Sequence, residues 1–300
     1  MKRPWTMLLV IAVPYLWLAA FFLVPFLIVL KISFSQTALA QPPYVPVLDL
    51  AAGWQGLRDF VAALTLDGYA LLFSDSLYLT SYLKSLMIGV GATTILLLFG
   101  FPLAYALARA PRGAQAILVV LVVLPFWTSF LIRIYAWMNI LQRDGLLNGL
   151  LQAIGIIDAP LAWLATDTAI MIGLVYSYLP FMVLPLYASL QKLDTSLLEA
   201  ASDLGAPAWK AFWLVTVPLT RPGIIAGSLL CFIPIVGEFV IPDLLGGSQS
   251  LMIGQTLWLE FSSNKDWPVA SALAVVLLAV LLMPIVFYQR QQMRALEQQG

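Results

Sequence analysis

The chain has 300 residues, of which 62% are hydrophobic and 10% charged, and its formal net charge is zero. Soluble domains carry about 25% charged residues, so this composition excludes an ordinary water-soluble protein and indicates a chain built for a lipid bilayer. The sequence contains no histidine and one cysteine, Cys231, which excludes an internal disulfide, a cysteine-built metal site and histidine-based nucleophilic catalysis. It also lacks a GxxxxGKS/T loop for ATP. We therefore expect no catalytic site, no bound metal or cofactor and no nucleic acid partner.

Six stretches of the sequence are apolar and long enough to cross a bilayer core, which takes about 20 residues of helix. Counted from the N-terminus, they cover residues 8–30, 85–108, 114–132, 168–191, 222–242 and 268–289. Several contain prolines, which membrane helices tolerate because neighbouring helices satisfy the carbonyl groups that a proline leaves free. The sequence therefore predicts an all-α, polytopic membrane protein with six transmembrane helices, forming one domain over residues 1–300.

The distribution of basic residues predicts the orientation of these spans. Alternate loops and tails hold nine basic residues on one side and six on the other. The nine are Lys2, Arg3, Arg109, Arg112, Lys192, Lys210, Arg221, Arg290 and Arg294. Because their side includes short loops and both tails, we expect both termini to lie in the cytoplasm. The long loop over 32–84 is then external, and its amphipathic pattern predicts short helices on the outer membrane surface or over the mouth of a pathway.

A short polar loop over residues 192–221 separates the fourth and fifth predicted spans on the cytoplasmic side. Ser196 with Glu199 three residues later forms a capping-box pattern, which predicts a short helix that starts near Ser196. Gly205 can adopt a positive φ and so end this helix. A second short helix is expected from Pro207 to Pro218, because proline suits the first turn of a helix.

This loop resembles the EAA loop of the permeases of ABC importers, whose motif is EAA, three residues, Gly, nine residues and I-x-L-P. Glu199-Ala200-Ala201 and Gly205 match it, and Val215-Thr216-Val217-Pro218 match with valine in place of isoleucine and leucine. The resemblance implies a type I ABC importer permease fold in which the loop forms a coupling helix. Such a helix docks into a groove on a cytosolic ATP-hydrolysing subunit, where small residues permit close approach. The coupling residues implied are Glu199, Ala200, Ala201, Asp203, Leu204, Gly205 and Pro218.

A second resemblance concerns the cargo. The stretches GEFVIPDLLGG (237–247) and NKDWPVASALAVV (264–276) are similar to permeases of spermidine and putrescine importers, the PotB/PotH type, and most of all to its putrescine branch, PotH. The resemblance implies a transport subunit in a bacterial inner membrane that is not itself an enzyme. Its implied partners are two copies of an ATPase that binds ATP and Mg, a second and different permease, and an extracytoplasmic polyamine-binding protein.

Several alternatives remain at this stage. The same permease role could serve another small organic solute, and the loop over 192–221 could be an amphipathic hairpin on the membrane surface with Glu199 capping its own helix. An intramembrane enzyme would need a nucleophile and a base facing each other inside the spans, and the chain has no histidine. A secondary transporter would usually show repeated halves with paired broken helices, and the sequence shows no such repeat.

A polyamine needs carboxylates for its ammonium groups and aromatic faces for cation–π contact and methylene packing. Glu238 is the one acid well inside a predicted span, near the expected outer end of the fifth, and Asp243 follows Pro242, where the helix is expected to end or bend. The aromatic candidates are Trp127, Tyr135, Trp137, Tyr176 and Tyr178. The competing interpretation is that Glu238 pairs with a basic group on a neighbouring subunit or packs protonated, and that the aromatic residues form the interface belt or the packing.

Overall fold

In the computed structural model, the structure describes residues 4–47, 51, 53–247 and 250–297. Helices account for most of these residues, and the strands form one short antiparallel pair, β1 (Gln36–Thr37) with β2 (Tyr44–Val45). The contacts within the chain cluster in two compact units, and the prediction of one domain over residues 1–300 stays a prediction. The smaller unit comprises residues 1–80 with 256–300, and the larger unit comprises residues 81–255.

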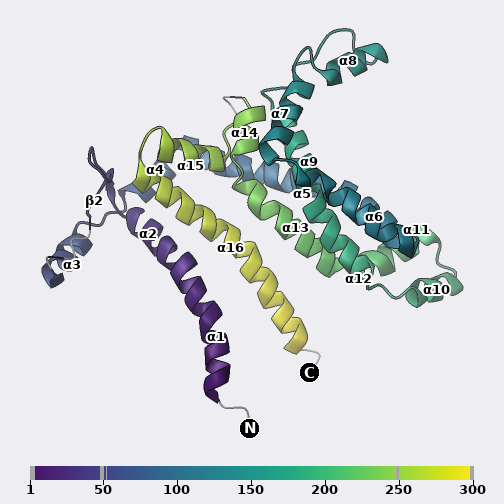
Figure 1. The fold of residues 1–300 in the computed structure, drawn as a ribbon, viewed down its shortest axis with the longest axis horizontal. Coiled ribbons are helices and arrows are strands. Elements are labelled where there is room, and N and C mark those ends of the chain that lie inside the picture. The colour runs from purple at the N-terminus through teal and green to yellow at the C-terminus, as the bar shows by residue number, and fades with distance from the viewer. Residues whose placement is uncertain (1–3, 48–50, 52, 248–249, 298–300) are drawn as a thin grey trace. The chain divides into compact units, whose positions relative to one another are not determined.

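The smaller unit is built from two long helical rods and a set of short helices. Its elements are α1 (Pro4–Leu18), the π-helical turn η1 (Ala19–Leu23), α2 (Val24–Ile32), α3 (Gly53–Ala62), α4 (Asp67–Ser74) and α16 (Trp267–Glu297). Figure 1 shows α2 and α16 side by side, and α16 also contacts α4. The helices α3 and α4 confirm the short helices predicted for the loop over 32–84. From Val10 to Ile28 most side chains of the first rod are exposed, as suits a helix that faces lipid or another subunit.

The larger unit holds the main apolar core around one central helix, α9 (Asp167–Leu190). Its other elements are α5 (Ser76–Arg109, which begins in the smaller unit), α6 (Arg112–Val123), η2 (Leu124–Trp127), α7 (Phe130–Leu141), α8 (Leu146–Ala153), α10 (Ser196–Asp203), α11 (Ala208–Ala211), η3 (Phe212–Thr216), α12 (Val217–Leu219), α13 (Arg221–Val236), α14 (Val240–Leu245) and the start of α15 (Ile253–Ser262). The helix α9 contacts α6, α7, α13 and α14. In Figure 1, α8 and α10 lie at opposite ends of this unit, as expected for loops on opposite sides of a membrane.

The helices confirm an all-α, polytopic membrane protein. By length and composition, four helices in the described part of the chain could cross a membrane unbroken, and the number is six if each of two bent pairs forms one span. The bent pairs are Arg112–Trp127 with Phe130–Ala153, at 85°, and Ala208–Leu219 with Arg221–Val236, at 66°. Two of the six predicted spans therefore differ from straight helices.

The third predicted span, over 114–132, is broken in its last turns. The helix α6 ends at Val123, a 3-10 turn containing Pro125 follows, and Thr128 and Ser129 are extended, with ψ of 153° and 137°. Proline has no N–H to continue the helical hydrogen bonds, and the extended pair turns the chain into α7. The prediction of one helix through residue 132 is therefore wrong.

The fifth predicted span, over 222–242, ends earlier than expected. The helix α13 stops at Val236, and Gly237 follows it as the C-terminal cap residue. A new short helix, α14, then contains both Pro242 and Asp243, so the prediction that the helix ends or bends at Pro242 is wrong. Glycine is a weak helix former. The side chain of the next residue, Glu238, accepts the N–H groups of Phe239 and Val240 in place of helical carbonyl groups.

Two glycines on α13 let this helix approach α9 closely. A Cβ added at Gly223 would lie 2.5 Å from the Cβ of Ser189 and 2.8 Å from the carbonyl oxygen of Pro185. At Gly227 it would lie 2.9 Å from the sulfur of Met182 and 3.1 Å from the carbonyl oxygen of the same residue. Small residues allow this backbone approach between membrane helices. The two helices that flank the loop over 192–221 are thus packed directly on each other.

Candidate functional site

The EAA loop (residues 192–221) begins with α10, which starts at Ser196 as the sequence predicts. The cap, however, comes from Asp194, whose Oδ1 accepts a 3.0 Å hydrogen bond from the backbone N–H of Ser196. This bond lowers the pKa of Asp194, so its carboxylate is charged at neutral pH and faces the positive end of the helix. The predicted capping box does not form, because Asp194 takes the N–H that the box would use. The side chain of Glu199 is exposed and bonds to no described residue.

The helix α10 ends at a left-handed glycine, as predicted. Gly205 has a φ of +80°. Its N–H donates to the carbonyl of Ser202 at 2.8 Å, and the N–H of Ala206 donates to the carbonyl of Ala201 at 3.0 Å. This pair of bonds is a Schellman motif, in which a residue without a Cβ is strongly preferred. A Cβ at Gly205 would meet nothing within 4 Å, so the backbone angle alone requires the glycine.

The loop has a half-buried anchor in its second half, from α11 to α12, and an exposed apolar face. The ring of Phe212 lies 5.4 Å from that of Phe101 and 5.9 Å from that of Tyr105, so it fixes the loop on α5. Leu204, Trp209 and Trp213 point outward and are 89%, 64% and 60% exposed. Ala200 and Asp203 are exposed as well, whereas Ala201 and Pro218 are half-buried. The arrangement leaves apolar side chains available to a partner.

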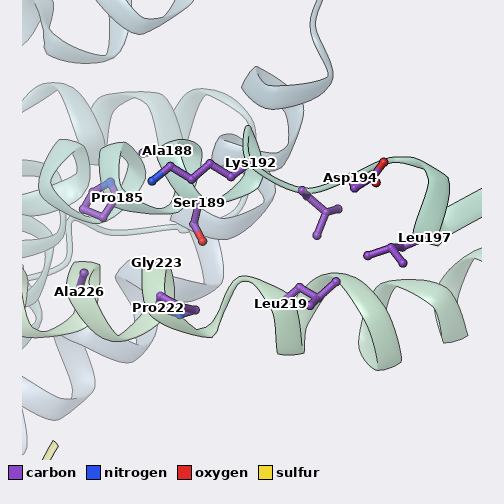
Figure 2. A pocket seen from close by; sticks show the side chains of 11 residues that line it. Pro185, Ala188, Ser189, Lys192, Asp194, Leu197, Leu219, Pro222, Gly223 and Ala226 are labelled. Carbon is purple, nitrogen blue, oxygen red and sulfur yellow. The ribbon is translucent and has the colours of Figure 1, made fainter. Parts of the chain in front are cut away.

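A groove of about 610 Å³ lies under the base of this loop, between the end of α9 and the start of α13. In Figure 2, Ser189 points into the groove and Lys192 extends back along α9 toward Ala188 and Pro185. Asp194 lies on the loop itself, where it caps α10. Gly223, at the close contact between the two helices, also lines the groove. The loop is therefore joined at both ends to tightly packed helices.

Glu238 lies at the break between α13 and α14 and accepts three hydrogen bonds. Its Oε1 accepts the backbone N–H groups of Phe239 at 3.2 Å and Val240 at 3.0 Å, which cap α14. Its Oε2 accepts the hydroxyl of Tyr178 at 2.7 Å. Tyr178 lies midway along the 24 residues of α9, so the carboxylate is level with the middle of this helix. The prediction that Glu238 lies within a helical span near its outer end is wrong: it lies between helices and at mid-height.

The other residues predicted for the pathway do not form one site. Trp137 and Tyr176 contact each other with rings 5.3 Å apart, but Tyr176 and Tyr178 are two residues apart on α9 and so point to different faces. The rings of Trp127 and Tyr135 are exposed. Asp243 is exposed too and accepts a 3.3 Å bond from Gln255. Only Tyr178 joins Glu238.

Similarity to known proteins shows the family of the chain. Residues 97–294 match the family described as the binding-protein-dependent transport system inner membrane component. The chain belongs to this family. The spermidine/putrescine transport system permease protein PotB of Haemophilus influenzae is 40% identical over 280 residues, which are 93% of this permease and 92% of that protein. PotB of Escherichia coli K12 is 44% identical over 226 residues, 75% of this permease and 82% of the relative. The predicted preference for the putrescine branch stays a prediction.

A solved structure shares the fold of the permease. It is the crystal structure of a bacterial alginate ABC transporter in complex with an alginate pentasaccharide-bound periplasmic protein. The match has a TM-score of 0.69 at 18% identity and covers 98% of the permease and 96% of that chain. The resemblance therefore concerns the arrangement of the helices. Together with the family, it identifies the chain as a transport subunit of the ABC importer type.

The sequence reasoning missed three residues that continue the ring contacts of Tyr178 away from Glu238. The ring of Phe181 lies 6.0 Å from that of Tyr178, and the ring of Phe126 lies 5.2 Å from that of Phe181. The guanidinium of Arg133 then lies 4.7 Å from the ring of Phe126. A phenylalanine in an apolar span gives no indication in the sequence of which rings it will contact. Arg133 does stand out, because it is the first charge after the uncharged run 114–132 of the permease.

Arg133 is buried, with 9% of its surface exposed. It stacks on Phe126 and, at 5.7 Å, on Phe130. Its Nε and Nη1 have no hydrogen-bond partner among the described residues of the permease. Cation–π contact compensates part of the cost of burying the guanidinium, but not its missing hydrogen bonds. Among the residues that the structure describes, no three His, Cys, Asp or Glu side chains gather as metal ligands would.

Proposed function

We propose that this permease belongs to an ATP-driven importer that carries polyamines such as putrescine and spermidine across the bacterial inner membrane. The observation that carries the proposal is the Glu238 carboxylate, held at a helix break halfway along the bundle. Non-helical backbone at membrane depth is tolerated where it is buried in protein or lines a cavity. An ionised side chain there marks a pathway for a charged solute. The names of the relatives supply the solute class.

The hydrogen bonds of Glu238 suit it to receive an ammonium group. Its Oε1 is occupied by the backbone of α14, which fixes the side chain. Its Oε2 accepts only the Tyr178 hydroxyl in the described structure, and a carboxylate oxygen has two acceptor positions. A substrate ammonium can therefore bind Oε2 without disrupting the helix cap. The rings of Tyr178, Phe181 and Phe126 offer adjacent apolar faces for the methylene chain.

The EAA loop supplies the connection to ATP hydrolysis. We assign the exposed face around Leu204, with Glu199, Asp203 and the alanines of the motif, to contact with an ATPase subunit that binds ATP and Mg. Helix-in-groove docking uses such an apolar face. Because this chain has one such loop, a complete transporter needs a second permease, which we propose to be a different chain, together with two ATPase copies and a polyamine-binding protein outside. The excess of basic residues on one side of the predicted spans supports a cytoplasmic location for both termini and the EAA loop.

The mechanism we propose is alternating access. Closure of the ATPases moves the EAA loop, and the loop moves the helices to which it is joined. The contacts at Gly223 and Gly227 make α9 and α13 move together, and these helices carry Tyr178 and, at the end of α13, Glu238. Rearrangement of packed helices of this kind opens a bundle to one side at a time.

Copurification and uptake test the proposal together. The tagged permease should bring an ATPase and a second permease from cells that express the whole importer. Cells with the importer should take up labelled putrescine or spermidine, and unlabelled amino acids should not compete. An ATPase that copurifies while an amino acid competes fully would keep the permease role and reject the polyamine cargo. Absence of any ATPase would reject both.

A further inference from the structure

A second pocket, of about 350 Å³, lies where three helices of the larger unit begin or end. The helix α5 ends at Arg109, α6 begins at Arg112, and α9 ends at Leu190, and all three residues line the pocket. The helices α5 and α9 are two of the four that could cross a membrane unbroken. Because a spanning helix leaves the hydrocarbon near its end, the pocket lies at the level of the lipid headgroups.

The charge of this pocket is positive. Arg109 and Arg112 both line it, and none of the residues that line it is acidic; Asp194, between the lining residues Leu193 and Thr195, lines the neighbouring groove and caps α10. Neither arginine forms an ion pair with a carboxylate in the described part of the chain. The guanidinium of Arg109 lies 5.0 Å from the centre of the Tyr105 ring, which orients it along the wall. The hydroxyl of Thr195 is a further polar group in the lining. The pocket therefore favours an anion over a cation.

Gln115 links the end of α5 to the end of α9 beside the pocket. Its amide donates to the carbonyls of Ala108 at 3.2 Å and Ala110 at 2.9 Å, at the end of α5. Its Oε1 accepts from the amide of Gln191 at 3.2 Å and from the hydroxyl of Tyr187 at 3.4 Å, on and just after α9. The turn that carries both arginines is thus tied to the end of α9, and the guanidinium groups are presented on a fixed frame.

We propose that this pocket binds the phosphate of an anionic phospholipid headgroup. Guanidinium groups match phosphate oxygens with paired hydrogen bonds, and phosphate is the anion present at high density where spanning helices end. Basic pockets between membrane helices on the cytoplasmic side bind such headgroups. Leu190 and Ala108 in the lining offer apolar surface to the glycerol part. The assignment to the cytoplasmic leaflet rests on the proposed function.

The bound headgroup would also steady the base of the EAA loop. Leu193 and Thr195 line the pocket and are the residues that lead into α10. The carbonyl of Thr195 accepts the backbone N–H of Glu199 at 3.1 Å, in the first turn of that helix. Anionic lipid therefore acts on the segment that joins the membrane helices to the ATPase contact.

The test measures lipid binding to the purified importer complex by native mass spectrometry after delipidation. The probes are phosphatidylglycerol and phosphatidylethanolamine, which carry the same phosphate but differ in net charge. Wild type should bind phosphatidylglycerol more tightly, and Arg109→Gln with Arg112→Gln should weaken that binding about tenfold or more, because two charged hydrogen-bond donors are lost. Arg109→Lys with Arg112→Lys should retain part of it, which shows that the pocket still folds.

The matched control is Lys210→Gln with Arg221→Gln, which removes the same charge from the same predicted side. It should change phosphatidylglycerol binding less than about twofold, since screened surface charges contribute little. Equal loss in the control, or full binding by the Arg109/Arg112 glutamine pair, would overturn the proposal. Displacement of the lipid by millimolar inorganic phosphate would replace it with a free-phosphate site.

Loss of the ATPase subunit from the Arg109/Arg112 glutamine pair, with phosphatidylglycerol binding unchanged, would show that an acidic protein surface occupies the pocket instead, and would also overturn the proposal. Lipid binding is measured without transport. A failure here therefore leaves polyamine uptake by the wild type untouched, and a failure of polyamine uptake leaves this binding measurement interpretable.

Discussion

The hydroxyl of Tyr178 donates a 2.7 Å hydrogen bond to Oε2 of Glu238, although the two residues lie 60 positions apart in the chain. The bond joins the middle of α9 to the break between α13 and α14. Because Oε1 caps α14 through two backbone N–H groups, the carboxylate has one fixed orientation. This arrangement holds the carboxyl group of Glu238 in a fixed position, level with the middle of α9.

Replacing Glu238 by glutamine tests the role of this carboxyl group. Glutamine keeps an acceptor oxygen for the Phe239 and Val240 N–H groups, so α14 should stay capped and the complex should assemble. Loss of a charged contact to a substrate ammonium costs about 1.5–3 kcal/mol, so polyamine transport efficiency should fall roughly ten- to hundredfold. Uptake kinetics and complex yield are measured on the same preparation.

The matched control for this variant is Asp243→Asn, which removes the same charge from the exposed side chain on α14. It should leave uptake within about twofold of wild type, as expected for an exposed group away from the pathway. Normal uptake by Glu238→Gln would remove Glu238 from the pathway. A drop in complex yield along with uptake would show instead that Glu238 pairs with a basic group of the second permease.

Gly205→Val should uncouple the permease from its ATPase. Valine at a φ of +80° costs about 1–2 kcal/mol of strain and redirects the chain between α10 and α11. We expect less ATPase to copurify. Gly205→Asn should copurify nearly as much as wild type, because asparagine tolerates the left-handed region.

A second control for Gly205→Val is Gly149→Val, at a helical glycine whose added Cβ also meets nothing within 4 Å but whose φ is not positive. It should behave as wild type. If Gly205→Val retains the ATPase fully, the coupling role of this loop is contradicted.

The sequence predicts where α10 begins and which glycine ends it, but not which residue caps its N-terminus. The left-handed turn at Gly205 is predictable because it depends on a single glycine, which three residues separate from the Glu-Ala-Ala of the motif. The spacing between Ser196 and Glu199 predicts a capping box, yet Asp194, two residues before Ser196, takes the N–H of Ser196. Several cap-forming residues lie within four positions here, and their competition depends on where α9 ends.

Neither the helix breaks nor the contacts of Glu238 could be predicted from the local sequence. Pro180 and Pro185 are inside α9, which continues unbroken, whereas Pro125 coincides with a break. Whether a proline breaks a membrane helix depends on whether neighbours satisfy the freed carbonyls, which no single segment reveals. The pairing of Tyr178 with Glu238 is likewise set by the packing of α13 on α9.

Arg133→Met tests whether the buried guanidinium has an acceptor in the isolated permease. Methionine keeps the apolar contacts with Phe126 and Phe130 and removes N–H groups that have no partner among the described residues. Replacing such a buried charge by an apolar side chain should leave the free energy of unfolding unchanged or raise it by about 1–4 kcal/mol. The control Arg143→Met, at an exposed arginine, should have no effect. A clear loss of stability in Arg133→Met alone would show that the guanidinium is hydrogen-bonded.

Single cysteines test the proposed orientation. The native Cys231 is buried, so its background labelling by a membrane-impermeant reagent should be low. Asp59→Cys, in α3, should label from outside intact spheroplasts, and Asp203→Cys, in α10, should label only after the membrane is opened. Labelling of Asp203→Cys from outside would place the EAA loop out of reach of a cytosolic ATPase.

Polyamine uptake by the reconstituted importer tests the proposed transport function as a whole. The complex containing this permease is placed in proteoliposomes with the binding protein outside and ATP inside, and labelled putrescine and spermidine are followed. We expect at least one of them to accumulate. Accumulation should require ATP and the binding protein and should fall roughly ten- to hundredfold with Glu238→Gln. Accumulation of neither polyamine by an assembled complex whose ATPase responds to another loaded solute would contradict the proposed function.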